Sequence, residues 1–292
     1  MRPFLGICAI VKNEGAYIHE WLTYHRAIGV ERFTLYDNGS TDDTLAEVAR
    51  FGHPVDVIPW LGSAQQVPAY RDMLANRRHY AEWVAFIDVD EFLTPRGDAT
   101  VPDILRAVPD DAGTLYVHWL CFGSSGQETR QPGFVTERFQ RRGPMGWGPN
   151  HYGKSVVRMD SAAELKTPHL IVSDARAVNT HGEDIARDDG KQETPCHLAI
   201  ALHHYFTKSR EEWIMRRAHG RPALPKDHPD SIRGIDQFQA LDRNDEADDT
   251  AARIMRGIQS EADEIEFRMT GRLARIEDPM IEFYRTGTLT PA

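Results

Sequence analysis

The sequence has 292 residues and a formal net charge of −10, from 34 Lys and Arg against 44 Asp and Glu. This charge excludes a general nucleic-acid binder, whose affinity would come from neutralising phosphates. Apolar residues make up 41% and charged residues 27% of the chain, so we expect a globular protein with a large α/β core and a tail.

The first ninety residues alternate between short apolar runs and segments with helical periodicity. Continuous apolar runs are typical of strands buried on both faces of a parallel sheet. The predicted strands are 4–11, 32–36, 55–60 and 83–87, and the predicted helices are 17–28, 44–51 and 69–81. This alternation predicts a doubly wound, mostly parallel sheet with helices on both faces.

The pattern changes after residue 95. We expect a helix at 101–108 and strands at 114–122, 154–159 and 169–172, with a Gly-rich stretch of ~30 residues after the first of these strands. Segment 199–206 is apolar but of undetermined type, 209–217 is a predicted helix, and the chain from 235 onward is predicted to be helical. We therefore divide the chain into a main domain at 1–220, with halves at 1–95 and 96–220, and a helical extension at 221–292.

Two carboxylates, Asp88 and Asp90, follow the fourth predicted strand directly. Residues two apart in a strand share a side, and a turn also lets both converge on one ligand. Such close carboxylates repel each other unless a cation or a sugar hydroxyl lies between them. An acidic surface turn is the alternative interpretation, but the end of a strand in an α/β sheet is where ligands bind.

Two further polar clusters follow strands. Lys12-Asn13-Glu14 ends the first strand, and Asp37-Asn38-Gly39-Ser40-Thr41-Asp42 ends the second and leads into a helix. An Asp in this position accepts hydrogen bonds from a base or a ribose, although a plain turn with a helix cap has the same composition. We expect all three clusters to converge on one edge of the sheet.

Together these motifs resemble GT-A glycosyltransferases of the family 2-like superfamily, and more closely glycosyltransferase family 92. The residues that carry the resemblance are 9–14, 36–42, 86–92, Trp119, 122–126, 154–158, His204-Tyr205, Lys208-Ser209 and Glu212-Trp213. They extend from the first strand to about residue 220, and their joint order is more specific than any one of them.

The resemblance implies a metal-dependent transferase that uses a nucleotide-sugar donor, usually a uridine diphosphate sugar, with Mn²⁺ or Mg²⁺. Asp88 would contact the ribose or the metal, and Asp90 would ligate the metal that bridges the diphosphate. Glu14 and Asp37 would lie around the nucleobase and ribose, with Lys12 in the same donor site. In such a site the ion acts as a Lewis acid.

Further candidates come from later segments. Relatives commonly add a His metal ligand, for which we favour His204, then His169, with His181 also open, although a lone His is more often structural. Lys154 and Arg158 face the diphosphate in this interpretation, or are exposed charges on an edge strand. An inverting enzyme also needs a carboxylate base, for which Glu128 ranks ahead of Glu137, Glu183 and Asp184.

We expect a soluble, cytoplasmic protein, at most peripheral at the inner face of the membrane. The three cysteines are far apart, the first residues read as a strand instead of a signal peptide, and no run approaches the roughly 20 apolar residues that span a bilayer. Animal members of family 92 carry a membrane anchor, so the resemblance points here to a bacterial-type relative. Its acceptor would be a glycan, such as a lipid-linked or surface polysaccharide precursor.

Two other functions remain open from the sequence. A nucleotidyltransferase also uses acidic pairs and a divalent ion, but usually has a Gly-rich phosphate loop near its N-terminus, where this chain has isolated glycines. A non-catalytic module that binds a nucleotide sugar or a glycan could share the fold, because a fold does not determine function.

Overall fold

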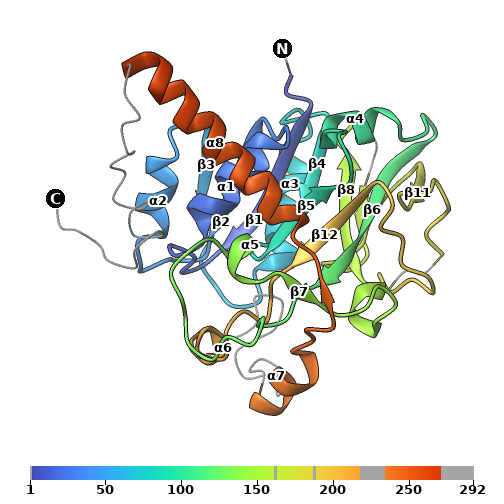
Figure 1. Ribbon diagram of the computed structural model, residues 1–292. Helices are drawn as coiled ribbons and strands as arrows, with labels where there is room; N and C mark the ends of the chain where they lie inside the picture. Colours follow the sequence, from blue (N-terminus) through green and yellow to red (C-terminus); the bar gives the residue numbers. More distant parts are fainter. Residues whose placement is uncertain (1, 161–162, 187–188, 218–233, 271–292) are drawn as a thin grey trace.

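The computed structural model describes residues 2–160, 163–186, 189–217 and 234–270 (Figure 1). Its first half contains every element expected from the alternation. These are β1 (Leu5–Val11), α1 (Ile18–Ala27), β2 (Arg32–Asp37), α2 (Thr44–Arg50), β3 (Val55–Pro59), α3 (Gln66–Asn76) and β4 (Trp83–Phe86). Helix α3 begins three residues earlier than predicted and includes Pro68, which the first turn of a helix tolerates.

The second half has more strands than the sequence predicts. It contains β5 (Glu91–Pro95), α4 (Val101–Arg106), β6 (Ala112–Cys121), α5 (Val135–Arg138), β7 (Arg141–Arg142), a 3₁₀ turn (Gly148–His151), β8 (Gly153–Arg158), β9 (Ala163–Leu165), β10 (Ile171–Ser173), β11 (Arg176–Val178), β12 (Ile200–His204), α6 (Arg210–Arg217), α7 (Ile235–Leu241), β13 (Glu246–Ala247) and α8 (Thr250–Thr270). The apolar segment of undetermined type is therefore a strand, because both β5 and β6 pair with it.

One mixed sheet forms the centre, in the order β3-β2-β1-β4-β8-β6-β12-β5 with β11 beside β6. Strands β1 to β4 pair in parallel, and β6 is parallel to β11 and β12. Strands β8 and β5 run antiparallel to their neighbours. The expected α/β class with a mostly parallel sheet is confirmed, and β4, β6 and β12 all end at the same edge as β1 and β2.

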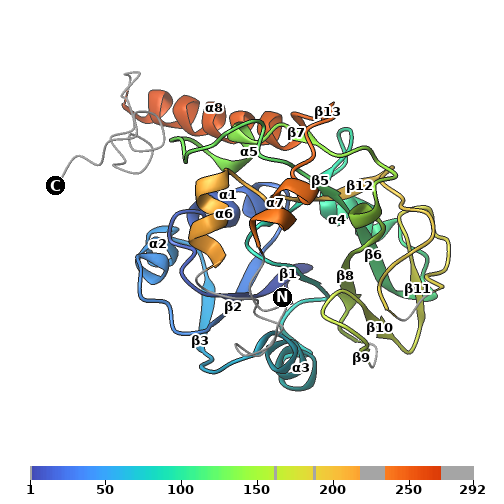
Figure 2. The ribbon, with the colours of Figure 1, turned by 90° about the horizontal axis from the view of Figure 1, so that it is seen from below.

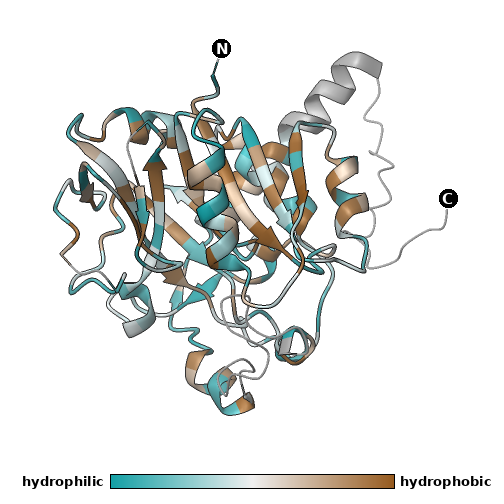
Figure 3. Cartoon of the chain, turned by 180° about the vertical axis from the view of Figure 1, so that it is seen from behind, coloured by the Kyte–Doolittle hydropathy of each residue, from teal (hydrophilic) through white to brown (hydrophobic). Residues whose placement is uncertain are grey.

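Helices cover both faces of this sheet. Along β1, Ile7 and Ala9 face one apolar cluster, which includes α1, α4, α5 and part of α8, while Cys8 and Ile10 face a second cluster built on α3. Figure 2 shows α3 on one side of the strands and α1, α5 and α8 on the other. The strands carry most of the apolar colour in Figure 3, as expected for strands covered on both faces.

Two buried polar side chains of α1 fix elements that lie far from it in the sequence. His25 accepts a hydrogen bond from the Leu93 amide at 3.2 Å through Nε2, and burial lowers the pKa of His25 to about 3. The Glu20 carboxylate accepts hydrogen bonds from the amides of Val135 and Thr136 at 2.7 and 3.0 Å. Strand β5 and helix α5 therefore take their positions from α1.

The chain after residue 234 packs against the rest of the structure. Ala251 and Met255 of α8 are buried in the cluster that contains α1 and α5. Asp242 accepts hydrogen bonds from the Ser124 amide and hydroxyl, at 2.6 and 3.0 Å, and β13 pairs with β7. None of the described helices, α8 included, is long and apolar enough to cross a membrane.

Candidate active site

The loops that follow β1 and β2 lock together. The Asn13 carboxamide accepts a hydrogen bond from the Thr41 amide at 2.8 Å, and the Glu14 amide donates to the Thr44 hydroxyl at 2.8 Å. Asn13 adopts a φ of 55°, a left-handed conformation that Asn tolerates better than most residues. The two polar clusters expected at the sheet edge therefore form one surface.

Asp37 is buried at this surface and supports the turn after β2. Its carboxylate accepts a hydrogen bond from the Ser40 amide at 3.1 Å. Lys12 and Glu14 are half-buried nearby. Burial raises the pKa of Glu14, although Arg216 and Lys208 are close enough to oppose this effect. The three residues predicted for the nucleoside end of the donor site thus share one edge of the sheet.

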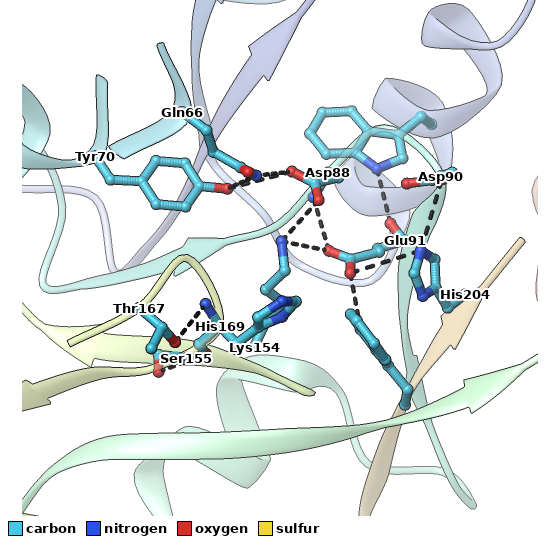
Figure 4. Close-up of polar contacts among 12 residues, drawn as sticks. Gln66, Tyr70, Asp88, Asp90, Glu91, Lys154, Ser155, Thr167, His169 and His204 are labelled. Atoms are coloured by element: carbon cyan, nitrogen blue, oxygen red, sulfur yellow. Dashed lines mark hydrogen bonds and ion pairs between the residues drawn. The ribbon is translucent and has the colours of Figure 1, made fainter. Parts of the chain in front are cut away.

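Asp88 lies at the end of β4, between two groups of donors (Figure 4). One carboxylate oxygen accepts hydrogen bonds from Gln66 at 2.7 Å and from the Tyr70 hydroxyl at 3.3 Å. The other accepts from the Lys154 ammonium at 2.8 Å. Lys154 is buried and is therefore a partner of the acidic residues, not an exposed cation on an edge strand.

Glu91 is fully buried beneath the acidic pair and was not among the predicted site residues. Its carboxylate accepts hydrogen bonds from the Asp88 amide and the Trp119 indole, both at 2.8 Å, and lies 3.2 Å from Lys154. Burial raises the pKa of Glu91, and Lys154 opposes this effect. Glu91 thereby joins β5 to β6, β8 and the backbone of the Asp88 turn.

Asp90 lies next to His204 from the end of β12. The His204 Nε2 atom is 3.6 Å from Asp90 Oδ2, and Arg216 Nη1 of α6 is 2.5 Å from the same oxygen. Burial alone would raise the pKa of Asp90, but Arg216 and then His204 hold it well below its ordinary value. Arg216 and His204 therefore both favour the ionised form of Asp90.

The structure adds two cations to this edge that were not predicted. Arg216 is one, and Lys208 is the other, which is 4% exposed with its ammonium 4.3 Å from the centre of the Tyr17 ring. Burial and the Arg216 charge lower the pKa of Lys208. Lys208 lies in a motif that carries the family resemblance, so the sequence offered a signal for its role in the site. Nothing in the sequence connects Arg216 to Asp90.

Two other predicted residues, Arg158 and His181, lie away from the acidic pair. Arg158 is opposite Trp83, the first residue of β4, and so lies at the other end of that strand. His181 lies in an exposed turn beside Glu183. His169 packs edge-on against Trp119, with ring centres 5.1 Å apart, and burial and Lys154 lower the pKa of His169 to about 4.

The four candidate bases occupy three places. Glu128 is exposed beside the first turn of α6, where its carbonyl accepts a hydrogen bond from the Glu211 amide. Glu137 is on α5, near Arg256 of α8. Glu183 and Asp184 are in the turn after β11, beside the beginning of β6 and hence at the edge opposite Asp88. Glu128 thus contacts α6 at its first turn, through Arg210 and Glu211.

The residues around Asp90 suit a divalent ion that is held partly by side chains and partly by a bound substrate. Among the residues that the structure describes, no group of three or more His, Cys, Asp or Glu side chains is placed to hold a metal by itself. Asp90 and His204 nevertheless offer a carboxylate and an imidazole on one side, and Mg²⁺ is often held by one or two carboxylates together with substrate phosphates. The pair therefore fits a metal whose remaining ligands come from the donor and water.

The chain is similar to known glycosyltransferases. The model of glycosyltransferase family 92 matches residues 7–174. A family 92 protein of Oryza sativa subsp. japonica is 34% identical over 163 residues, which cover 53% of this chain and 27% of the relative. A family 92 protein of Ricinus communis is 40% identical over 128 residues, 41% of this chain and 23% of the relative. The chain thus spans about a quarter of the length of these relatives.

Solved structures give a weaker likeness. Glucosyl-3-phosphoglycerate synthase from Mycobacterium tuberculosis, in complex with Mn²⁺, UDP-glucose and phosphoglyceric acid, is 18% identical and matches with a TM-score of 0.29. The match covers 40% of this chain and 44% of that chain. This TM-score is too low to support an argument about function.

Proposed function

The chain belongs to glycosyltransferase family 92, and from that membership we propose that it transfers a sugar from a nucleoside diphosphate sugar, with uridine as the expected nucleoside, to an acceptor hydroxyl. The observation that carries the proposal is the set of charges at one edge of the sheet. Asp90 and His204 lie side by side and are the proposed ligands of a divalent cation, and Lys208 and Arg216 lie beside them. A bound divalent cation and cationic side chains together suit a diphosphate ligand.

In this proposal residues 1–95 bind the donor and residues 96–220 bind the acceptor. The locked loops that carry Lys12, Glu14 and Asp37 hold the nucleoside, and Asp88 is within reach of the ribose. Lys208 and Arg216 stabilise the negative charge that develops on the departing diphosphate, because cations beside that charge interact with it more strongly in a partly buried site than in water. When bound by Asp90 and His204, Mn²⁺ or Mg²⁺ would add Lewis-acid stabilisation of the same charge.

Glu128 is the proposed base that takes the proton from the acceptor hydroxyl, which would give inversion at the anomeric carbon. Its carboxylate is exposed beside Arg210 at the first turn of α6, whereas Glu183 and Asp184 lie at the opposite edge. The proposed acceptor is a glycan or a lipid-linked polysaccharide precursor. The proposed location is the cytoplasm, where a lipid-linked acceptor would bring the enzyme to the inner face of a membrane.

The test is calorimetric titration with UDP and with a panel of UDP- and GDP-sugars, with and without Mn²⁺. We expect metal-dependent binding in the unaltered protein and in the control Asp98→Asn, whose residue is exposed in the loop after β5. In Asp90→Asn we expect the metal's contribution to disappear, because the amide keeps the shape but loses the charge. If the folded protein binds no nucleotide with metal present, the transferase proposal is wrong.

One observation favours a second function, a module that binds nucleotide sugars without metal. Lys154 pairs with Asp88 and Arg216 pairs with Asp90, so each of the two carboxylates has a cationic partner from the chain itself. Such a module would bind the donor equally with and without Mn²⁺ and would show no sugar transfer to any acceptor. The same titration therefore separates the two functions.

A further inference from the structure

Arg216 and a divalent cation would need the same oxygen of Asp90. The Arg216 Nη1 atom is 2.5 Å from Asp90 Oδ2, and His204 Nε2 is 3.6 Å from that oxygen. Because Oδ2 is the Asp90 oxygen beside His204, we expect an ion held jointly by the two side chains to approach it. A guanidinium and a doubly charged ion on one carboxylate oxygen repel each other strongly, because a partly buried site screens charges poorly.

Of the three side chains, Arg216 is the one that can leave. Asp90 is 3% exposed, and its carbonyl accepts a hydrogen bond from the Tyr205 amide at 2.8 Å. His204 is 8% exposed and lies in β12 opposite Glu91 of β5. The Arg216 side chain is 40% exposed and extends from the last turn of α6. A long side chain at this position can change its partner without disturbing the sheet.

The charges around Arg216 favour a second anionic partner. Asp88, Asp90, Glu91 and Glu14 lie near Arg216, Lys208 and Lys154. A divalent ion alone would add two positive charges to this set, whereas an ion that arrives with a diphosphate adds little net charge. The diphosphate also offers oxygens that a guanidinium binds in a bidentate manner.

We propose that Arg216 is a counter-ion that exchanges partners: it pairs with Asp90 when no metal is bound, and the divalent cation displaces it onto the donor's diphosphate. This inference rests on the proposed function. The exchange couples the two ligands, because the metal releases the residue that binds the diphosphate, and the diphosphate removes the residue that blocks the metal. Metal alone then binds weakly, and metal with a nucleoside diphosphate binds cooperatively.

The test is calorimetry of Mn²⁺ alone, UDP alone, and each in the presence of the other, on the unaltered protein, Arg216→Gln and Arg216→Lys. For Arg216→Gln we expect Mn²⁺ alone to bind about tenfold more tightly, UDP to bind more weakly, and the cooperativity between them to fall. Arg216→Lys keeps the charge, so Mn²⁺ alone should bind as weakly as it does to the unaltered protein.

Arg253→Gln is the matched control, since Arg253 is exposed on α8 and pairs with Asp249. It should leave all four titrations unchanged. The proposal is overturned if Arg216→Gln binds Mn²⁺ no more tightly than the unaltered protein and keeps full cooperativity with UDP. That result leaves the transferase intact, whereas absence of nucleotide binding in the unaltered protein defeats the proposed function itself. If Arg216→Gln does not fold, a tightening of Mn²⁺ binding in Arg216→Lys overturns the proposal.

Discussion

The two sides of the candidate site are built in different ways. On the proposed nucleoside side, β2 and β4 both pair with β1 in the sheet, and the loops after β1 and β2 lock together within the first 45 residues. On the other side, α5, α6 and the segment around Asp242 are joined by buried polar contacts between distant parts of the chain, such as Arg138 with Glu212. Local patterns therefore specify the first side, and a few individual side chains specify the second.

The largest expected effect is at Glu91, where the two sides meet. Replacing Glu91 with Ala leaves the buried Lys154 ammonium with Asp88 as its remaining acidic partner and the Trp119 indole without its acceptor. Breaking a buried pair in this way costs about 3–5 kcal/mol. Urea unfolding should show this loss of stability, and Glu193→Ala, at an exposed position, should show almost none. A loss below about 1 kcal/mol would mean that Glu91 does not hold the two sides of the site together.

A smaller effect, with a pH signature, is expected at the link between α5 and α6. Burial would raise the pKa of Glu212, but Arg138 and Ser209 lower it to about 2. Because the folded pKa is below the unfolded value near 4.5, the link stabilises the fold above that pH and the stabilisation is lost as the pH falls towards 2.

Arg138→Met should therefore reduce the free energy of unfolding at pH 7 and flatten its decline between pH 4.5 and 2. The measurement is urea unfolding at a series of pH values, with Arg141→Met as the control, because Arg141 donates to backbone carbonyls and is exposed. An unchanged slope in Arg138→Met would assign the acid sensitivity to other carboxylates.

The smallest expected effect is at Asp242, which accepts two hydrogen bonds from Ser124. Asp242→Ala removes the acceptor for the Ser124 amide and hydroxyl and should cost about 1–3 kcal/mol. Hydrogen exchange should quicken at Ser124 and at neighbouring amides of its loop, and remain unchanged in β1. Faster exchange in β1 as well would show that the two sides of the site unfold as one cooperative unit.

The sequence predicted the strands and helices of the proposed nucleoside side well, because these elements carry continuous apolar runs with polar residues at their ends. Strand β5 was missed, since Glu91–Pro95 follows an acidic turn and acquires its strand conformation from β12 and from His25. The pairing of Arg216 with Asp90 joins residues that are 126 positions apart, and no local pattern reports such a contact. Arg158 was predicted near the acidic pair but lies far from it. Strand β8 runs antiparallel to β4, so its last residue, Arg158, is opposite the first residue of β4.

The position of α8 also has a consequence for how the protein is made. Ala251 and Met255 of α8 pack in the apolar cluster that contains Ile18 and Trp21. The apolar surface of the N-terminal segment is therefore synthesised long before the helix that covers it. Chains emerge at roughly 5–20 residues per second, and exposed apolar surface during that interval promotes aggregation. Translation that stops before α8 therefore yields a nascent polypeptide with this surface uncovered, which is the kind of surface that chaperones bind.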